Sequence, residues 1–308
     1  MHLPVLLDAF LRRSAPLLRP GSRWVDGTFG RGGHTRALLE RGCRVLALDR
    51  DAEAAEAARA LRAQWPDTMN FAQSNFREIG ERVAEIGWGE VEGVLLDLGV
   101  SSPQFDDAQR GFSFRFEAPL DMRMDRGQEL TAARIVNETE ETALADLFYQ
   151  LGDERDSRRI ARALARRRET KPFATTTELA EAVAAALPHR RGKKIHPATQ
   201  VFQALRIAVN GEKDALAEVL PAASALVAPG GALAVISFHS GEDRVVKEFM
   251  KDRARPQLPT PDFDPTPRWN PEWLFSKVER DLPDEAEIAA NPRSRSARLR
   301  TAWKREAA

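Results

Sequence analysis

The sequence predicts an α/β protein whose mainly parallel sheet is interrupted by an inserted helical domain. Three short apolar runs each end on an aspartate, at Asp26, Asp49 and Asp97, and a glycine-dense turn at residues 30–33 follows the first run. The strand–helix alternation stops after the third run and resumes with an apolar run at residues 232–238. Because parallel strands present their carboxyl ends at one edge, we expect the three aspartates to line the edge where ligands bind.

The spacing of apolar residues predicts the elements of the first part of the chain. Strands are expected at 23–26 and 44–49, with a helical pattern between them that opens after the glycines. The next elements are a helix at about 51–64, a strand near 70–72, a further helix and a buried strand at 91–97.

A helical and strongly charged pattern extends from about residue 105 to 210. Its expected helices are 131–136, 140–151, 157–168 and 175–187. A capping box from Thr175 to Glu178 opens the last of them. We therefore expect a discontinuous sheet domain at 1–104 and 211–308, with a helical insert at 105–210.

The alternation resumes after the insert. A helix and a turn at residues 228–231 lead into the strand at 232–238. Residues 256–271 are proline-rich and read as an irregular loop. Trp269 and Trp273 near its end either pin it to the core or stack on a base.

The composition indicates a globular protein without a membrane span. The chain has 308 residues, of which 43% are hydrophobic, which is enough for one large or two ordinary domains. Asp8, Arg12 and Arg13 interrupt the N-terminal segment, so we expect no export signal. The single cysteine, Cys43, fits a reducing cytoplasm, and the five histidines show no metal-ligand spacing. Basic and acidic residues number 46 each, so any binding to nucleic acid must come from local clusters.

The glycine turn indicates the class of ligand. It lacks the third glycine of a dinucleotide-binding turn, and the chain contains no phosphate-binding loop of the G-x-x-x-x-G-K-[ST] type. A glycine-dense turn that lacks a phosphate-binding pattern suits S-adenosylmethionine, because the amino acid end of this cofactor must come close to the protein backbone. Asp49 can accept hydrogen bonds from the two hydroxyls of its ribose. The alternative is that the glycines only form a tight turn and Asp49 only caps a helix.

The segment after Asp97 predicts where chemistry takes place. Residues 102–105 are Ser-Pro-Gln-Phe, which loosely resembles the Ser-Pro-Pro-Tyr motif of enzymes that methylate exocyclic amines. Such an amine is a poor nucleophile, so the site must accept its hydrogen bond, align it and remove a proton. Asp97 or Ser102 can accept that bond, and Phe105 can stack on the base. The alternative is an ordinary turn with a capping aspartate.

Three basic clusters are candidates for contact with nucleic acid. Five arginines at helical spacing form one face of a predicted helix, namely Arg155, Arg158, Arg159, Arg162 and Arg166. This face either contacts phosphates or is merely solvated. Lys193 and Lys194 form a second cluster, and residues 293–300, with Arg293 and Arg295, form a third.

Taken together, these segments closely resemble the bacterial cytosine-N4 methyltransferases that modify 16S ribosomal RNA. The matching stretches span nearly the whole chain in the family's order: residues 2–7, 25–34, 95–104, 110–114, 119–125, 158–163, 196–199, 202–207, 237–240 and 291–293. Local departures occur at Gly241, at 200–201 and at 210–213, where they concern fine contacts with RNA.

The resemblance implies a Rossmann-like, S-adenosylmethionine-dependent methyltransferase fold with a helical insert that helps to grip RNA. The implied partners are 16S ribosomal RNA or the small ribosomal subunit, and a homodimer is compatible with the sequence. The implied cofactor contacts are Gly32, Gly33, His34, Asp49, Phe76, Asp97 and Gln104.

Two other classes share part of this pattern. A small-molecule methyltransferase would keep the cofactor turn but has little use for three basic clusters and a large charged insert. A non-catalytic RNA-binding protein would keep the clusters but does not need the turn beside Asp97 and Ser102.

Overall fold

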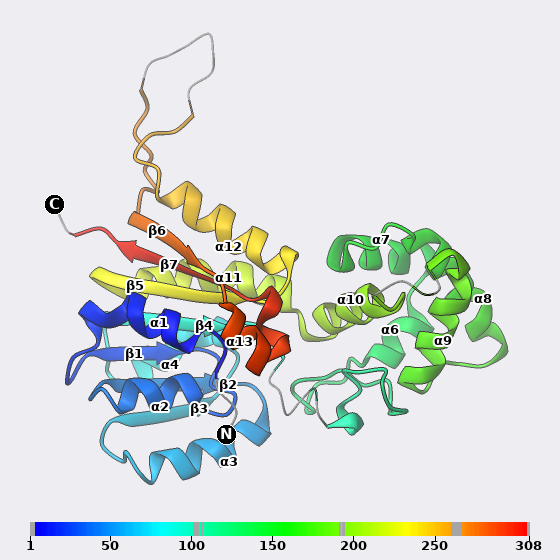
Figure 1. Ribbon diagram of the computed structural model, residues 1–308, viewed down its shortest axis with the longest axis horizontal. Coiled ribbons are helices and arrows are strands. Elements are labelled where there is room, and N and C mark those ends of the chain that lie inside the picture. The colour runs from blue at the N-terminus through cyan, green and yellow to red at the C-terminus, as the bar shows by residue number, and fades with distance from the viewer. Residues whose placement is uncertain are drawn as a thin grey trace. The chain divides into compact units, whose positions relative to one another are not determined.

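The computed structural model describes residues 4–100, 105, 107–190, 192, 195–259 and 267–306 (Figure 1). The chain forms two compact units. One comprises Met1–Gly99 and Ala215–Ala308, and the other comprises Val100–Asp214.

The first unit is built on a seven-stranded sheet with the order β3-β2-β1-β4-β5-β7-β6. Its strands are β1 (Arg23–Asp26), β2 (Arg44–Asp49), β3 (Met69–Gln73), β4 (Val91–Asp97), β5 (Val227–Ser237), β6 (Phe275–Asp281) and β7 (Arg298–Lys304). The first five pair in parallel, whereas β7 is antiparallel to both of its neighbours. The α/β class with a parallel sheet is therefore confirmed. The chain order reverses between β1 and β4, the kind of switch point at which such sheets bind ligands.

Alternating side chains of the strands bury both faces of this sheet. In β2, Leu46 and Leu48 belong to one core cluster, and Val45 and Ala47 belong to the other. The first cluster is covered by α4 (Ile79–Glu85), α11 (Glu212–Leu226) and α12 (Ser240–Arg253). The second is covered by α1 (Leu7–Ser14), α2 (Gly33–Leu39) and α3 (Ala52–Arg62). Burial on both faces is why these strands read as continuous apolar runs.

The prediction of a turn at residues 228–231 is wrong. These residues belong to β5, whose register against β4 shifts between Val91 and Gly93. Gly230 has φ of +75°, a conformation that costs glycine little and lets the strand absorb the irregularity as a bulge.

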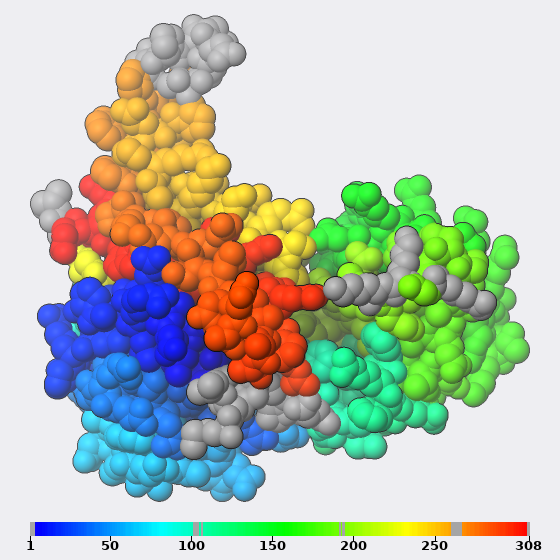
Figure 2. All heavy atoms as spheres, viewed as in Figure 1, coloured from blue at the N-terminus to red at the C-terminus, as the bar shows by residue number. Residues whose placement is uncertain are grey.

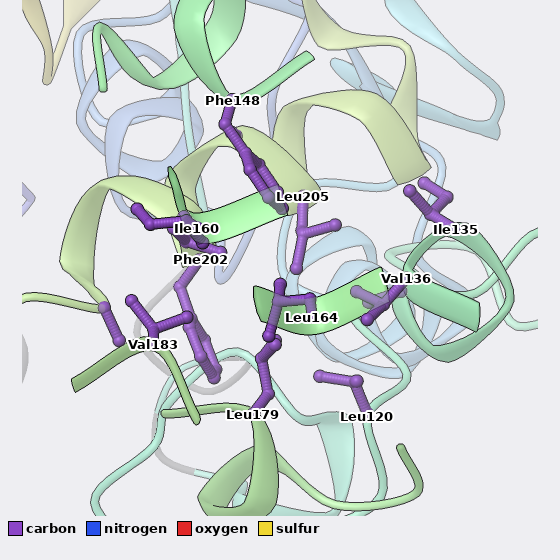
Figure 3. Packing of buried hydrophobic residues seen from close by; sticks show 14 of the residues in the cluster. Leu120, Ile135, Val136, Phe148, Ile160, Leu164, Leu179, Val183, Phe202 and Leu205 are labelled. Carbon is purple, nitrogen blue, oxygen red and sulfur yellow. The ribbon is translucent and has the colours of Figure 1, made fainter. Parts of the chain in front are cut away.

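The second unit contains α6 (Ala132–Glu138), α7 (Glu141–Gly152), α8 (Ser157–Thr170), α9 (Thr176–Ala186) and α10 (Thr199–Asn210). Each helix contributes apolar residues to one core, including Val136, Phe148, Leu164, Leu179 and Leu205 (Figure 3). The predicted capping box is present: the Thr175 hydroxyl accepts the Glu178 N–H, and the Glu178 carboxylate accepts the Thr175 N–H.

The two tryptophans at the end of the proline-rich loop differ in their burial. Trp273 is partly buried and donates its indole N–H to the Phe275 carbonyl oxygen at 3.0 Å. Trp269 is 71% exposed, so packing in the core is excluded for this side chain. Across the described ranges, no helix is long and apolar enough to cross a membrane.

Candidate functional site

The turn after β1 is tied to both neighbouring strands. Gly27 donates its N–H to the Leu95 carbonyl oxygen at 2.9 Å, and Phe29 donates to that of Leu48 at 2.8 Å. The Thr28 hydroxyl accepts the Asp97 N–H at 2.6 Å. These bonds fix the turn at the carboxyl edge of the sheet, between β2 and β4.

Two positions in this turn accept only glycine. Gly32 has φ of +76°, and a Cβ there would lie 2.5 Å from Cε2 of Phe29. A Cβ on Gly33 would lie 2.2 Å from Cγ of Pro4. The first residue is needed for its backbone conformation and close approach, and the second for packing of the N-terminal segment.

Asp49 ends β2 and organises the turn from the other side. One carboxylate oxygen accepts the Gly30 N–H at 2.7 Å, and the other accepts the Asp51 N–H at 2.9 Å. Burial raises the pKa of Asp49, an effect that the two backbone donors oppose. Each oxygen has a second lone pair, so the carboxylate can still accept the two hydroxyls of a ribose.

Asp26 lies beneath the turn and is 1% exposed. Its carboxylate accepts the Thr28 N–H at 3.1 Å and the Thr35 hydroxyl at 2.7 Å. Burial raises the pKa of Asp26 to about 6 despite these hydrogen bonds. The prediction that the three aspartates end neighbouring strands at one edge is confirmed, but Asp26 serves as a support for the turn and is closed off from solvent.

Asp97 ends β4, at the centre of the carboxyl edge of the sheet, next to His34. Oδ1 of Asp97 is buried and has no hydrogen-bond partner in the part of the chain that the structure describes. Burial, together with the charges of Asp26 and Glu242, raises the pKa of Asp97 well above its usual value. An unsatisfied buried oxygen is costly, which indicates that a donor on a ligand completes it.

Phe76 lies at the same edge, just after β3. It begins the short helix η2 (Phe76–Glu78), and a Cβ on Gly27 would lie 3.5 Å from the Phe76 Cβ. The structure therefore brings together six of the expected cofactor residues, namely Gly32, Gly33, His34, Asp49, Phe76 and Asp97.

Four of the predicted site residues, Ser102, Gln104, Lys193 and Lys194, lie outside the described residues. Phe105 is described and is 38% exposed.

The carboxyl end of β5 adds residues that sequence reasoning did not place in the site. Asp97 is in register with Ile236, and Leu98 donates its N–H to the Ile236 carbonyl oxygen at 2.9 Å. Phe238, His239 and Glu242 follow directly at the same edge. The signal that could have found them is that they stand at or just beyond the end of the buried strand predicted at 232–238.

Two of the basic clusters are described. Arg293 and Arg295 are exposed in η5 (Pro292–Ser296), which precedes β7 and follows α13 (Glu285–Ala290); Figure 2 shows this orange-red segment at the surface. Because Arg298 at the start of β7 is in register with Ser237 at the end of β5, η5 lies at the ligand edge. Arg298 and Arg300 instead pair with Asp243 at 2.9 and 2.7 Å, which removes them from the expected patch.

The predicted arginine face lies on α8 in the second unit. Arg158, Arg159 and Arg162 are exposed. Arg162 contacts Glu141 at 3.5 Å, and no ion pair forms at Arg158 or Arg159 within the described ranges. Arg155 precedes α8, which begins at Ser157, so the prediction of a single helical face is wrong for this residue, whereas Arg158, Arg159, Arg162 and Arg166 lie on α8. Of these, Arg158 and Arg159 are available for an external anion.

Comparison with known proteins identifies the family. The model of the MraW methylase family matches residues 1–305. The Ribosomal RNA small subunit methyltransferase H of Rhodospirillum centenum is 47% identical over 305 residues, which cover 98% of this chain and 92% of that protein. The protein of the same name from Heliobacterium modesticaldum is 46% identical, with 98% of each chain covered.

Among solved structures, an rRNA methylase from Streptococcus thermophilus aligns with 99% of this chain and 100% of its own, with a TM-score of 0.46 and 10% identity. The family match over residues 1–305 and the two relatives at 46% and 47% identity agree with one another. The chain belongs to the MraW methylase family.

Proposed function

We propose that this chain is an S-adenosylmethionine-dependent methyltransferase that methylates the exocyclic N4 amine of a cytidine in 16S ribosomal RNA. The observation that carries the proposal is the meeting of the glycine turn, Asp49 and the unsatisfied Oδ1 of Asp97 at one sheet edge. The family and the names of its members support the same reaction class and substrate.

The residues present fit the cofactor. Gly32 leaves the backbone of the turn open to close approach, and Asp49 offers two oxygens to the ribose. Phe76 lies beside the turn, where an aromatic ring can cover the adenine. When bound, S-adenosylmethionine supplies a methyl group made electrophilic by its sulfonium.

Asp97 is the group that we assign to the amine. As the N4 nitrogen bonds to the methyl carbon, the carbon–sulfur bond breaks with its electron pair going to sulfur, and the amine gives up one proton. Oδ1 of Asp97 is a buried acceptor without a partner among the described residues, and a raised pKa makes the carboxylate a better base. Ser102 remains the second candidate for holding the amine.

Binding of RNA is assigned to local basic surfaces because the chain has equal numbers of acidic and basic residues. Arg158, Arg159 and Arg162 on α8, with Lys193 and Lys194, would contact phosphates from the insert at 105–210. Arg293 and Arg295 would do so from the catalytic domain at 1–104 and 211–308. The protein would act in the cytoplasm, on 16S RNA or the small subunit.

The test is transfer of a labelled methyl group to small ribosomal subunits from cells that lack this chain. We expect label on the N4 atom of a cytidine, located by nuclease digestion and mass spectrometry. The matched control is Asp67→Ala, which removes an exposed carboxylate ahead of β3, at the opposite edge of the sheet. Label on another atom, or a folded protein that binds S-adenosylmethionine but modifies neither subunits nor their RNA, would refute the proposal.

A further inference from the structure

The carboxyl end of β5 carries an imidazole that the reaction described above does not use. His239 stands two residues beyond β5, beside the Asp97 end of β4, and its side chain is 15% exposed. A Cβ on Gly99 would lie 3.4 Å from the ring of Phe238, so the chain leaving β4 passes directly over the residue that precedes His239. The imidazole therefore belongs to the edge at which the amine must be presented.

The hydrogen bonds of His239 assign its tautomer. Nδ1 accepts the Glu242 N–H at 3.3 Å, as the N-cap of α12, while the Glu242 carboxylate accepts the Phe238 and His239 N–H groups at 2.9 and 3.4 Å. A nitrogen that accepts from a backbone N–H carries no proton. The proton of the neutral ring is therefore on Nε2, which is a donor.

This donor is not satisfied within the described residues. Nε2 is buried without a hydrogen-bond partner; Oε1 of Glu242 is 3.1 Å away but is not aligned to accept. A buried N–H without an acceptor is costly, and such groups in native proteins are normally paired. The edge thus presents two incomplete groups, an acceptor at Oδ1 of Asp97 and a donor at Nε2 of His239.

A cytosine matches this pair of groups. Its N4 amine is a donor and the adjacent ring nitrogen N3 is an acceptor, whereas uracil has an acceptor at O4 and a donor at N3. We propose that His239 donates its Nε2–H to N3 of the target cytosine, so that His239 and Asp97 together select cytosine and aim its amine at the methyl group. This inference rests on the proposed function, and it makes His239 a residue for specificity and positioning.

Two variants separate the capping role of His239 from its proposed contact with the base. Asn places an acceptor near the position of Nδ1 and retains the N-cap, but it loses the donor at Nε2. Gln extends an N–H to about the position of Nε2 but weakens the cap. We expect His239→Asn to lower kcat/KM for small subunits by about 10- to 100-fold, with the Kd for S-adenosylmethionine and the Tm unchanged. His239→Gln should retain methylation within a few-fold and show the lower Tm.

An atomic substitution in the RNA provides the second test. Subunits are reconstituted with 3-deazacytidine, which has C–H in place of N3, at the cytidine located by the labelling experiment. The substitution should lower kcat/KM for the wild-type protein much more than for His239→Asn. Equal losses in the two proteins, or wild-type activity of His239→Asn on unmodified subunits, would overturn the inference. A wild-type protein that methylates no cytidine in unmodified subunits would instead refute the proposed function.

Discussion

Nδ1 of His34 lies 3.7 Å from Oδ2 of Asp97, while Nε2 of the same ring faces the Val5 carbonyl oxygen at 3.2 Å. Only an N–H can bond to that carbonyl, so the ring proton is on Nε2 and Nδ1 is bare. Burial lowers the pKa of His34 to about 4, and the ring is neutral at pH 7. Asp97 therefore has no positive charge at His34 to stabilise its ionised form, which favours uptake of a proton by the carboxylate.

Asp97→Asn tests whether this carboxylate acts in methyl transfer. The variant keeps the shape of the side chain but cannot take up the amine proton. We expect kcat at saturating S-adenosylmethionine to fall by about 100-fold or more, the usual contribution of a general base, as measured in single-turnover reactions. The companion Ser102→Ala should lower kcat without changing cofactor affinity. A raised KM for S-adenosylmethionine with an unchanged kcat would mean that Asp97 only holds the cofactor.

Asp26→Asn tests the buried carboxyl beneath the turn through the pH dependence of stability. The folded-state pKa of about 6 lies above the value near 4 of an unfolded aspartate, so the folded protein binds the proton more tightly. This stabilisation is present at low pH and is lost as pH rises through about 6. The free energy of unfolding of the wild type, minus that of the variant, should rise by about 2 kcal/mol from pH 7 to pH 4. Parallel curves in denaturant titrations would contradict the assignment.

The sheet edge could be predicted because its signals are local. Asp26, Asp49 and Asp97 each end an apolar run, and burial of parallel strands on both faces makes such runs conspicuous. The glycine at 32 could be predicted because its backbone conformation leaves little choice of residue, whereas the need for glycine at 33 comes from packing against Pro4.

The other side of the site could not be predicted because it depends on pairing between distant segments. Strand β7 alternates basic and apolar residues and reads as a basic cluster, but Arg298 and Arg300 pair with Asp243 on α12. His239 became a candidate only when the register of β5 against β4 placed it beside Asp97. A lone histidine after a strand gives no sign of its tautomer or of an unsatisfied nitrogen.

Gly32→Ala tests the backbone conformation of the turn. The new Cβ would meet the Phe29 ring at 2.5 Å in a backbone with φ of +76°. We expect a loss of about 2 to 4 kcal/mol in unfolding free energy and weaker cofactor binding, measured by denaturation and calorimetry. The control is Gly80→Ala in α4, where a Cβ meets nothing within 4 Å and should stabilise by up to about 1 kcal/mol. Equal effects at the two positions would show that the turn is not constrained as described.

Asp49→Ala tests the assignment of the ribose. Loss of charged acceptors should weaken S-adenosylmethionine binding by about 1.5 to 3 kcal/mol, or roughly 10- to 100-fold in Kd. Because Asp49 also holds the Gly30 N–H, circular dichroism and melting should accompany the calorimetry. Asp67→Ala, which changes the net charge equally, should bind normally. Unchanged affinity in folded Asp49→Ala would remove this residue from the cofactor site.

Arg158→Gln with Arg159→Gln tests the arginine face of α8. If both side chains contact phosphates, the double variant should bind small-subunit RNA more weakly, and the slope of log affinity against log salt should become shallower by about one per lost contact. Cofactor affinity should not change. Arg162→Gln should have a smaller effect because Arg162 already contacts Glu141 at 3.5 Å. The control is Arg134→Gln, since Arg134 is exposed in the same unit but bonded to Glu138 at 2.9 Å. An unaltered salt slope in the double variant would mean that this face is solvated and that RNA binds elsewhere.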